Sequence, residues 1–390
     1  MSGDALSRWR QEFPTVEDCT YLVSHSLGAM PRRTAASLQE YADTWSRRGV
    51  RAWHEGWWEL GRTTADLLAP ILGVAPGTIT MHQNVTVAMG IIASCFRFDG
   101  RRRKIVLTEL EFPTNMYLFE GCARYGAEIV YAEPDGSIKN DLDKLLDAID
   151  DRTVLVPLSL VLFRSSYIQN ARAVIEKAHR VGAHVILDVY QAAGTVPLDI
   201  ASLEADFAVG GSVKWLCGGP GAGYLYVRPD LAQTLEPSLV GWAGHAEPFA
   251  FKTGPIVYAD GPERFQSGTP NIPALYAVRA GYEIVASIGV PAIREKSLHL
   301  TRRIIEHAVA AGYGLNTPLD AAERGGAVVL DVPHAEAVST DLLRRNIIID
   351  YRPGAGIRMA PHFYNNEDDI DDAMKVLDDV IAVGEKHGWR

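Results

Sequence analysis

The chain has 390 residues, of which 47% are hydrophobic and 22% charged, and it is long enough for two or three domains of roughly 150 residues each. That composition is typical of soluble globular proteins and excludes collagen-like, disordered and low-complexity classes. The 38 basic and 48 acidic residues give a net charge of −10 without any block of basic residues, which argues against nucleic acid as a partner.

Cysteine spacing and the lack of long apolar segments favour a cytoplasmic protein. The four cysteines are widely spaced with no CxxC pair, so neither a disulfide framework nor a zinc ribbon is suggested. No apolar stretch approaches the roughly 20 residues that span a bilayer, and the N-terminus lacks the apolar core of a secretion signal. His179 and His184 have no cysteine or carboxylate that would complete a metal cluster, so no metal is expected.

The middle of the chain alternates short β-rich runs with helical patterns. Strands are expected at residues 104–109, 128–132, 153–160, 184–189, 206–210 and 224–227, and helices at 114–125 and 171–181. This alternation indicates an α/β fold with a parallel sheet and helices on both of its faces. The short strands that close the region look antiparallel.

Beyond about residue 270 the pattern changes to long helices mixed with short strands. Helices are expected at residues 273–288, 292–311, 338–345 and 368–386, and strands at 327–332, 347–351 and 357–360. We therefore expect an N-terminal arm (1–20), a large domain (21–270) and a smaller α+β C-terminal domain (271–390), against which the arm can pack. A cleft between two such units is a common place for a ligand.

The residues best suited to ligand binding or catalysis are concentrated between positions 187 and 228. Asp188 ends an apolar strand, and open α/β sheets bind ligands beyond the carboxyl ends of their strands. Lys214 follows 26 residues later between two glycine clusters, where a planar ligand could approach it closely. Partial desolvation would lower the pKa of its amine and make it nucleophilic enough to form a Schiff base. The glycines at 219, 221 and 223 lack the helix and acidic residue of a dinucleotide fingerprint.

This segment resembles the cofactor-binding core of pyridoxal 5′-phosphate (PLP) enzymes of fold type I, specifically the class V aminotransferase group that includes kynureninase. The resemblance implies a large domain with a mostly parallel seven-stranded sheet, a smaller α+β C-terminal domain, and a homodimer with a shared active site. It extends over nearly the whole chain in the segments SHSLGAMP (24–31), QNVTVAMG (83–90), LEFPTNMY (110–117), DVYQAAG (188–194), SVKW (212–215), GGPGAG (218–223), GWAGH (241–245), SGTPN (267–271) and GIRMAPHFYN (356–365).

The resemblance implies that four side chains hold or contact the ring of the cofactor. Lys214 would hold PLP and, once displaced by substrate, would move protons to and from the substrate. Asp188 would pair with the pyridinium nitrogen and keep it protonated. Gln191 is similar to the residue that hydrogen-bonds the ring oxygen, and Phe112 would stack on the ring. A place in the hydrophobic core is the alternative for Phe112.

The phosphate of PLP would be bound by backbone amides and hydroxyl groups. Val85 and Thr86 lie at the expected start of a helix, where free N–H groups and the helix dipole favour an anion. Thr86 could also be a simple helix N-cap. Ser212 is a further phosphate ligand that the resemblance implies, and Thr269 is another that would come from the neighbouring subunit.

The substrate would be an amino acid or a small amino-acid derivative. Arg358 resembles the residue that clamps the substrate carboxylate with its planar fork, and an ion pair with a nearby acid is its alternative. Ser26 and Trp242 are further candidates for substrate binding, although the GWAGH segment around Trp242 could be only a glycine-hinged loop.

Departures from the family pattern limit the reactions that we expect of this chain. Kynureninases carry Tyr where this chain has Val213, His where it has Gln191, and SNPP where residues 267–270 read SGTP. No cysteine follows Cys217, which argues against a cysteine desulfurase. We expect a PLP enzyme that forms an external aldimine with its substrate and acts as a tailoring lyase, or as a decarboxylative or oxidative deaminating enzyme, of specialised metabolism. A class V aminotransferase or epimerase, a kynureninase-type C–C hydrolase and a non-catalytic member of the fold are the alternatives.

Overall fold

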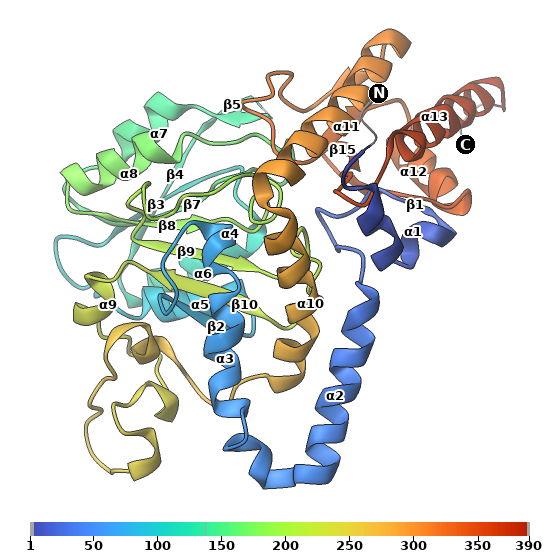
Figure 1. Ribbon diagram of the computed structural model, residues 1–390. Coiled ribbons are helices and arrows are strands. Elements are labelled where there is room, and N and C mark those ends of the chain that lie inside the picture. The colour runs from blue at the N-terminus through green and yellow to red at the C-terminus, as the bar shows by residue number, and fades with distance from the viewer. Residues whose placement is uncertain (1–3, 137, 388–390) are drawn as a thin grey trace.

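A twisted seven-stranded sheet forms the centre of the computed structural model, which describes residues 4–136 and 138–387 (Figure 1). The strand order is β2-β10-β9-β8-β7-β3-β4. Neighbours from β9 to β4 pair in parallel, whereas β10 is antiparallel to both β2 and β9. The predicted α/β fold, the mostly parallel sheet and its antiparallel end are confirmed. The strands are β2 (Ile79–His82), β3 (Lys104–Thr108), β4 (Glu128–Ala132), β7 (Thr153–Ser159), β8 (His184–Asp188), β9 (Phe207–Gly211) and β10 (Gly223–Val227).

Helices cover both faces of this sheet, which explains why its strands are nearly continuous apolar runs. Successive residues of β3 point to opposite faces, so Ile105 and Leu107 join one hydrophobic cluster and Val106 joins the other. One face carries α5 (Val85–Ala93), α6 (Pro113–Glu120) and η3 (Gly121–Tyr125). The other carries α3 (Trp57–Asp66), α4 (Ala69–Leu72), α7 (Leu142–Ala148), α8 (Ala171–Arg180) and α10 (Ile272–Ile288).

A four-stranded antiparallel sheet organises the C-terminal part of the chain, in the order β11-β12-β15-β14. Its strands and helices enclose a separate hydrophobic cluster. The boundary between the two units, expected after residue 270, stays a prediction, because α10 still packs in the large cluster. The elements are α11 (Val290–Ala311), β11 (Gly314–Leu315), β12 (Val328–Asp331), α12 (Ala335–Arg344), β14 (Asp350–Arg352), β15 (Gly356–Met359) and α13 (Glu367–His387).

The first residues described lie against the C-terminal unit. Strand β1 (Thr20–Tyr21) pairs in parallel with β13 (Ile347–Ile348), and the ring of Phe13 lies 4.6 Å from that of Tyr364.

None of the helices within 4–136 and 138–387 is both long and apolar enough to span a membrane. The remaining elements are η1 (Ser7–Glu12), α1 (Thr15–Asp18), α2 (Arg32–Arg48), η2 (Gly49–Trp53), β5 (Pro134–Asp135), β6 (Lys139–Asn140), α9 (Leu231–Thr234), η4 (Trp242–Gly244), η5 (Pro248–Ala250) and η6 (Gly261–Phe265).

Candidate active site

A cavity of about 240 Å³ opens where β7 and β8 end and where α5 and α6 begin, which is the edge of the sheet that the sequence pattern predicts for a ligand. Six residues predicted for the site line it together, although they come from distant parts of the chain. The lining residues are Asn84, Val85, Thr86, Phe112, Thr114, Asn115, Ser159, Val161, Phe163, Asp188, Tyr190, Gln191 and Lys214.

Lys214 lies in the tight turn that follows β9, and its amine is packed between aromatic rings. The Nζ atom is 4.3 Å from the ring centroid of Tyr190 and 5.7 Å from that of Phe112. Burial lowers the pKa of this amine to about 8, even though the nearby Asp188 carboxylate acts in the opposite direction. A larger fraction of the amine is therefore neutral near pH 7 than for an exposed lysine, and the neutral form is the nucleophile.

Asp188 is the last residue of β8 and is held by two hydrogen bonds. Its Oδ1 accepts the backbone N–H of Tyr190 at 2.9 Å, and its Oδ2 accepts Nδ2 of Asn115 at 3.2 Å. Burial raises the pKa of the carboxyl group. Asn115 was missed from the sequence, and its Oδ1 is a buried acceptor with no donor among the described residues. The cavity therefore contains a carboxylate and a free amide oxygen, which together suit a bound N–H group.

A second carboxyl group lies behind the first and was also missed from the sequence. Glu111 accepts Nδ2 of Asn115 at 3.2 Å and the backbone N–H of Ser159 at 3.0 Å. Burial raises its pKa to about 7, against the opposing effect of the hydrogen bonds from Ser159. One amide group thus contacts both carboxyl groups. The spacing of Glu111 and Asn115, four residues apart at the start of a helix, is the signal that could have found them.

The first turn of α5 presents backbone amides to the cavity. Asn84 caps this helix, because its Oδ1 accepts the backbone N–H of Val87 at 3.0 Å, so the alternative of Thr86 as the N-cap does not apply. The amides of Val85 and Thr86 have no acceptor within the helix, as in any first turn. A Cβ atom on Gly223 would lie 2.9 Å from the Asn84 backbone, so a glycine is needed for this turn to pass so closely over β10. Such an amide pair can bind an anion.

The side-chain amide of Gln191 is already engaged by the protein. Its Nε2 donates to the carbonyl oxygen of His25 at 3.1 Å, and its Oε1 accepts the indole N–H of Trp215 at 3.1 Å. The side chain still lines the cavity. These bonds fix its orientation and leave one N–H of the amide for a ligand.

Arg358 lies on β15 beside the cavity and is paired with Asp350 on β14, directly opposite in the register. Its Nε donates to Oδ1 at 2.7 Å and its Nη2 to Oδ2 at 2.5 Å, while Nη1 donates to the carbonyl oxygen of Phe163 at 2.8 Å. The ion-pair alternative is therefore realised. Two of the five guanidinium N–H bonds remain without an acceptor among the described residues, and two is the number that a carboxylate accepts from such a fork.

Besides Arg358, four of the predicted residues lie outside the cavity lining. Ser212 is buried and donates its hydroxyl hydrogen to the carbonyl oxygen of Ala222 at 2.7 Å. Thr269 is exposed and Ser26 is half-buried. Trp242 belongs to an aromatic cluster with rings of Trp58, Phe249 and Phe251. Their roles stay predictions.

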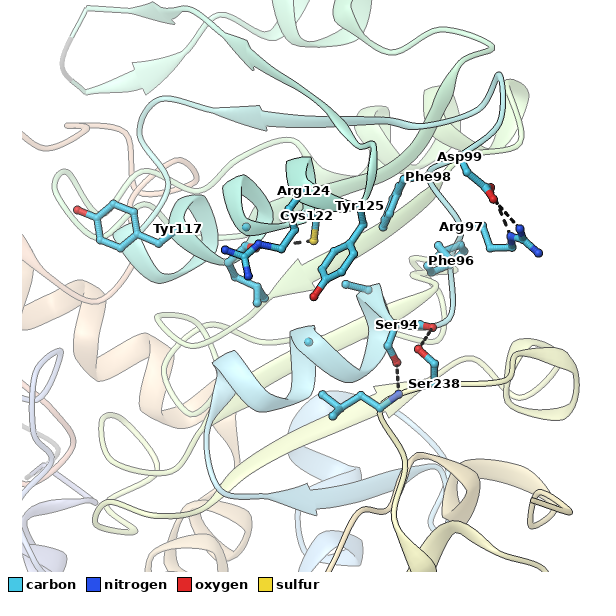
Figure 2. A pocket seen from close by; sticks show the side chains of 15 residues that line it. Ser94, Phe96, Arg97, Phe98, Asp99, Tyr117, Cys122, Arg124, Tyr125 and Ser238 are labelled. Carbon is cyan, nitrogen blue, oxygen red and sulfur yellow. Dashed lines mark hydrogen bonds and ion pairs between the residues drawn. The ribbon is translucent and has the colours of Figure 1, made fainter. Parts of the chain in front are cut away.

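A larger cavity of about 880 Å³ lies on another part of the surface, between the end of α5, the α6–η3 segment and Ser238 (Figure 2). Its polar contacts are ordinary ones, such as the exposed ion pair of Arg97 with Asp99 and the hydrogen bond from Ser238 to the carbonyl oxygen of Ser94 at 3.0 Å. None of the predicted site residues lines it. Within 4–136 and 138–387, no group of three or more His, Cys, Asp or Glu side chains is arranged to hold a metal ion.

Comparison with known families gives one match across most of the chain. The family model described as aminotransferase class-V matches residues 20–371. The kynureninase of Burkholderia pseudomallei strain 1106a is 32% identical over 403 aligned positions, covering 99% of this chain and 94% of its own. The kynureninase of Deinococcus radiodurans is 33% identical over 363 positions, covering 90% of this chain and 86% of its own.

Solved structures share the fold at lower sequence identity. The apo cysteine desulfurase of Thermococcus onnurineus NA1 superposes with a TM-score of 0.85 at 22% identity, covering 96% of this chain and 98% of that one. The cystine C–S lyase C-DES, in complex with its reaction product cysteine persulfide, superposes with a TM-score of 0.84 at 22% identity, covering 94% of this chain and 99% of that one.

Proposed function

Because this chain belongs to the class V aminotransferase family and is an enzyme that depends on PLP, we propose that it binds PLP in the cavity around Lys214 and acts there on an amino acid or an amino-acid derivative. The observation that carries this proposal is the position of Lys214, whose desolvated amine faces the same cavity as a buried carboxylate and a pair of helix-terminal amides. An ordinary surface lysine would have none of these neighbours.

The residues present fit PLP as a ligand. The unpartnered Oδ1 of Asn115 and the carboxylate of Asp188 would hold the protonated ring nitrogen, and the amides of Val85 and Thr86 would hold the phosphate. Phe112, on the rim of the cavity, would cover one face of the ring. When bound, PLP withdraws electrons from the bonds to the α-carbon of the attached amino acid, so that one of these bonds can break.

The protein decides which bond breaks by positioning the substrate. Two N–H groups of Arg358 would hold the substrate carboxylate, and Asp350 keeps the guanidinium in one orientation. Lys214 would hold or deliver a proton at the α-carbon, which its lowered pKa permits near neutral pH. The rings of Phe112, Phe163 and Tyr190 would exclude water from this space.

We assign the reaction to the class of lyases that cleave the substrate side chain, as a tailoring step on an amino-acid-derived substrate. Val213 supports this assignment over ordinary kynureninase activity, because the residue immediately before Lys214 has no phenol group. Kynureninase-type C–C hydrolysis is the second candidate, and the relatives named kynureninase support it.

A panel of substrates tests the proposed reaction. The purified protein is incubated with L-kynurenine, thioether conjugates and proteinogenic amino acids, with and without oxygen, and the products are identified by mass spectrometry. Alanine or pyruvate is the product expected from side-chain cleavage. A keto acid together with pyridoxamine phosphate would mean transamination, an inverted α-carbon would mean epimerisation, and carbon dioxide with oxygen uptake would mean oxidative decarboxylation; each would contradict the assignment.

Cofactor binding is tested separately from the reaction. The purified protein should be yellow, and borohydride should bleach it and attach the cofactor to Lys214, as peptide mass mapping would show. A colourless protein that does not respond to added PLP would contradict the whole proposal. The Lys214→Ala variant should lose turnover, and a variant that turns over at the wild-type rate would exclude the assigned role of Lys214.

We also propose that the active enzyme is a homodimer in which Thr269 approaches the cavity of the neighbouring subunit. Thr269 is exposed and lies outside the cavity of its own chain, which supports this arrangement. Apolar side chains nearby in the sequence are also exposed, as expected of an interface: Leu239 is 52%, Phe249 52% and Phe251 73% exposed. Sedimentation equilibrium tests the dimer, and a monomeric active enzyme would contradict it.

A further inference from the structure

The imidazole of His25 is a buried group that the proposed function does not use. Its side chain is 2% exposed, and its Nε2 lies 3.0 Å from Oδ1 of Asp350. Its other nitrogen, Nδ1, is buried and has no partner among the described residues. Polar atoms in protein interiors are nearly always paired, so this atom needs an explanation.

The partner of Nε2 determines what Nδ1 can do. The Asp350 carboxylate can only accept hydrogen bonds, since hydrogen bonds from His25 and Arg358 lower its pKa against the effect of burial. The hydrogen of the neutral ring is therefore on Nε2, and Nδ1 carries a lone pair. Burial lowers the pKa of His25 to about 4, which keeps the ring neutral. Nδ1 is thus a hydrogen-bond acceptor that lacks a donor.

His25 does not line the cofactor cavity, but it contacts residues beside the cavity in two directions. Its carbonyl oxygen accepts Nε2 of Gln191, which lines the cavity, and its ring shares the Asp350 carboxylate with Arg358. Three residues further on, the N–H of Gly28 donates to the carbonyl oxygen of Val213 at 2.8 Å, in the turn that carries Lys214. The charge of Lys214 is close enough to act on the imidazole. The ring therefore cannot move to another partner without breaking these contacts.

His362 shows that an unpartnered Nδ1 alone does not make a binding residue. Its Nδ1 is also buried without a partner among the described residues, and its Nε2 lies 2.8 Å from the carbonyl oxygen of Trp215. However, its ring is enclosed by those of Trp215, Phe363 and Tyr364, and among the described residues no carboxylate or guanidinium forms a hydrogen bond or ion pair with it. His362 fills an aromatic core, whereas His25 lies beside the proposed carboxylate clamp.

We propose that His25 is a substrate-binding residue whose Nδ1 accepts a hydrogen bond from an N–H or O–H group of the substrate side chain, beside the carboxylate held by Arg358. This inference rests on the proposed function and narrows its substrate class to amino acids with a donor group on the side chain. Asp350 is the positioning residue, because it orients both the imidazole and the guanidinium. A site built to accept such a bond rejects analogues without the donor.

Matched pairs of amino acids test this inference in the PLP-bound enzyme. The pairs are L-serine and L-alanine, L-threonine and L-valine, and L-kynurenine and its analogue without the ring amino group. Dissociation constants are measured from the change in cofactor absorbance on rapid mixing. The wild type should bind the donor-bearing member of at least one pair roughly tenfold more tightly.

Two variants separate the nitrogens of His25. His25→Gln keeps an N–H donor for Asp350 but removes the acceptor at Nδ1. The ratio of the two dissociation constants in a matched pair should therefore fall to about one. His25→Asn keeps an acceptor oxygen near Nδ1 but loses the bond to Asp350, so the preference should remain. His362→Gln is the control and should leave the preference unchanged. Circular dichroism and PLP content establish that each variant is folded and loaded.

The outcomes are distinct. A preference that is lost in His25→Gln and kept in His25→Asn supports the proposal, and an unchanged preference in His25→Gln, or none in the wild type, overturns it. If His25→Gln does not fold, His25→Asn decides alone: a retained preference supports the proposal and a lost one overturns it. A wild-type protein that binds no PLP overturns the proposed function as well, whereas a PLP-bound protein without donor preference overturns only this inference.

Discussion

The amine of Lys214 is subject to two opposed effects. Burial lowers its pKa, and the carboxylate of Asp188 raises it, with a result of about 8. The aromatic rings of Tyr190 and Phe112 add a cation–π attraction that favours the charged form, but they also keep water away. Desolvation is the larger effect, and it makes this lysine a better nucleophile than an exposed one.

This pKa predicts how cofactor attachment depends on pH. Attack requires the neutral amine, so the rate at which PLP attaches to the apoprotein should rise with pH through about 8 and then level off. The measurement is stopped-flow absorbance at a series of pH values. Because Asp188 raises the pKa of Lys214, the profile of Asp188→Asn should move to lower pH. A rate that still rises above pH 10 in the wild type would exclude a desolvated amine.

A conservative replacement tests the carboxylate clamp. Lys cannot present two parallel N–H groups, so Arg358→Lys should raise the KM for the amino acid roughly 10- to 100-fold while PLP content is unchanged. Arg352→Lys is the control, since Arg352 contacts the same Asp350 at 3.1 Å but is 47% exposed. Steady-state kinetics of both variants gives the comparison. An equal KM in the two variants would rule out a substrate contact by Arg358.

At the scale of elements, the site depends on turns that pass close to one another. Gly28 packs against the turn of Lys214, and a Cβ atom at this position would lie 2.1 Å from the Lys214 carbonyl oxygen. A backbone atom cannot move aside as a flexible side chain can. The N-terminal SHSLG segment and the SVKW turn therefore need a glycine where they meet.

Gly28→Ala should displace the turn that carries Lys214. We expect a loss of about 1–3 kcal/mol of unfolding free energy, as for other overpacked sites, and a lower PLP content per chain. Chemical denaturation and cofactor absorbance are the measurements. Gly100→Ala is the control, because a Cβ atom there meets nothing within 4 Å. An equal loss of unfolding free energy in both variants would mean that the close contact with the Lys214 carbonyl oxygen does not cause the destabilisation.

Element prediction succeeded where the periodicity was strong. The apolar runs of β7 and β8 and the helix α8 match their expected positions within one or two residues. No element was predicted for α2, in which most side chains are exposed and few are apolar. Short strands such as β1 exist only because a distant segment pairs with them.

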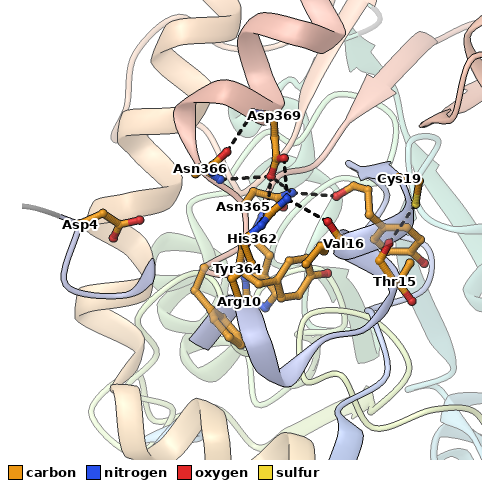
Figure 3. A network of polar contacts seen from close by, with 12 residues as sticks. Asp4, Arg10, Thr15, Val16, Cys19, His362, Tyr364, Asn365, Asn366 and Asp369 are labelled. Atoms are coloured by element: carbon orange, nitrogen blue, oxygen red, sulfur yellow. Dashed lines mark hydrogen bonds and ion pairs between the residues drawn. The ribbon is translucent and has the colours of Figure 1, made fainter. Parts of the chain in front are cut away.

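For the molecule as a whole, the N-terminal segment and the C-terminal unit meet in one polar network (Figure 3). Arg10 donates to both carboxylate oxygens of Asp369, at 2.6 and 2.9 Å, and to the carbonyl oxygen of Tyr364 at 3.0 Å. Asp369 also accepts Nδ2 of Asn365 at 2.9 Å. The N-terminal segment is therefore bound to the C-terminal unit, and it continues directly into His25.

Removal of Arg10 should weaken the attachment of this segment. Arg10→Ala leaves the carboxylate of Asp369 buried without its cation, and we expect a loss of about 2 kcal/mol of unfolding free energy. Denaturant unfolding measures it. Arg47→Ala removes an exposed pair with Asp43 and should cost at most about 0.5 kcal/mol. Equal effects of the two substitutions would show that the network does not anchor the N-terminus.

The sequence by itself determined the α/β class, six of the seven central strands, with β2 the exception, and the two residues on which the proposed cofactor site is built. Asp188 and Lys214 could be found because apolar strands have a local periodicity, and ligands of open α/β sheets bind where such strands end. The glycine clusters on both sides of Lys214 are a second local pattern that pointed to this residue.

Only the tertiary structure decided which distant side chains meet at this edge. The register between β14 and β15 pairs Asp350 with Arg358, and the packing of the N-terminal segment brings His25 to the same carboxylate from 325 residues away. Asn115 and Glu111 acquire their roles through contacts with Asp188 and Ser159, on strands that are separate in sequence. Such contacts follow from strand register and helix packing over the whole fold, which no local pattern of residues encodes.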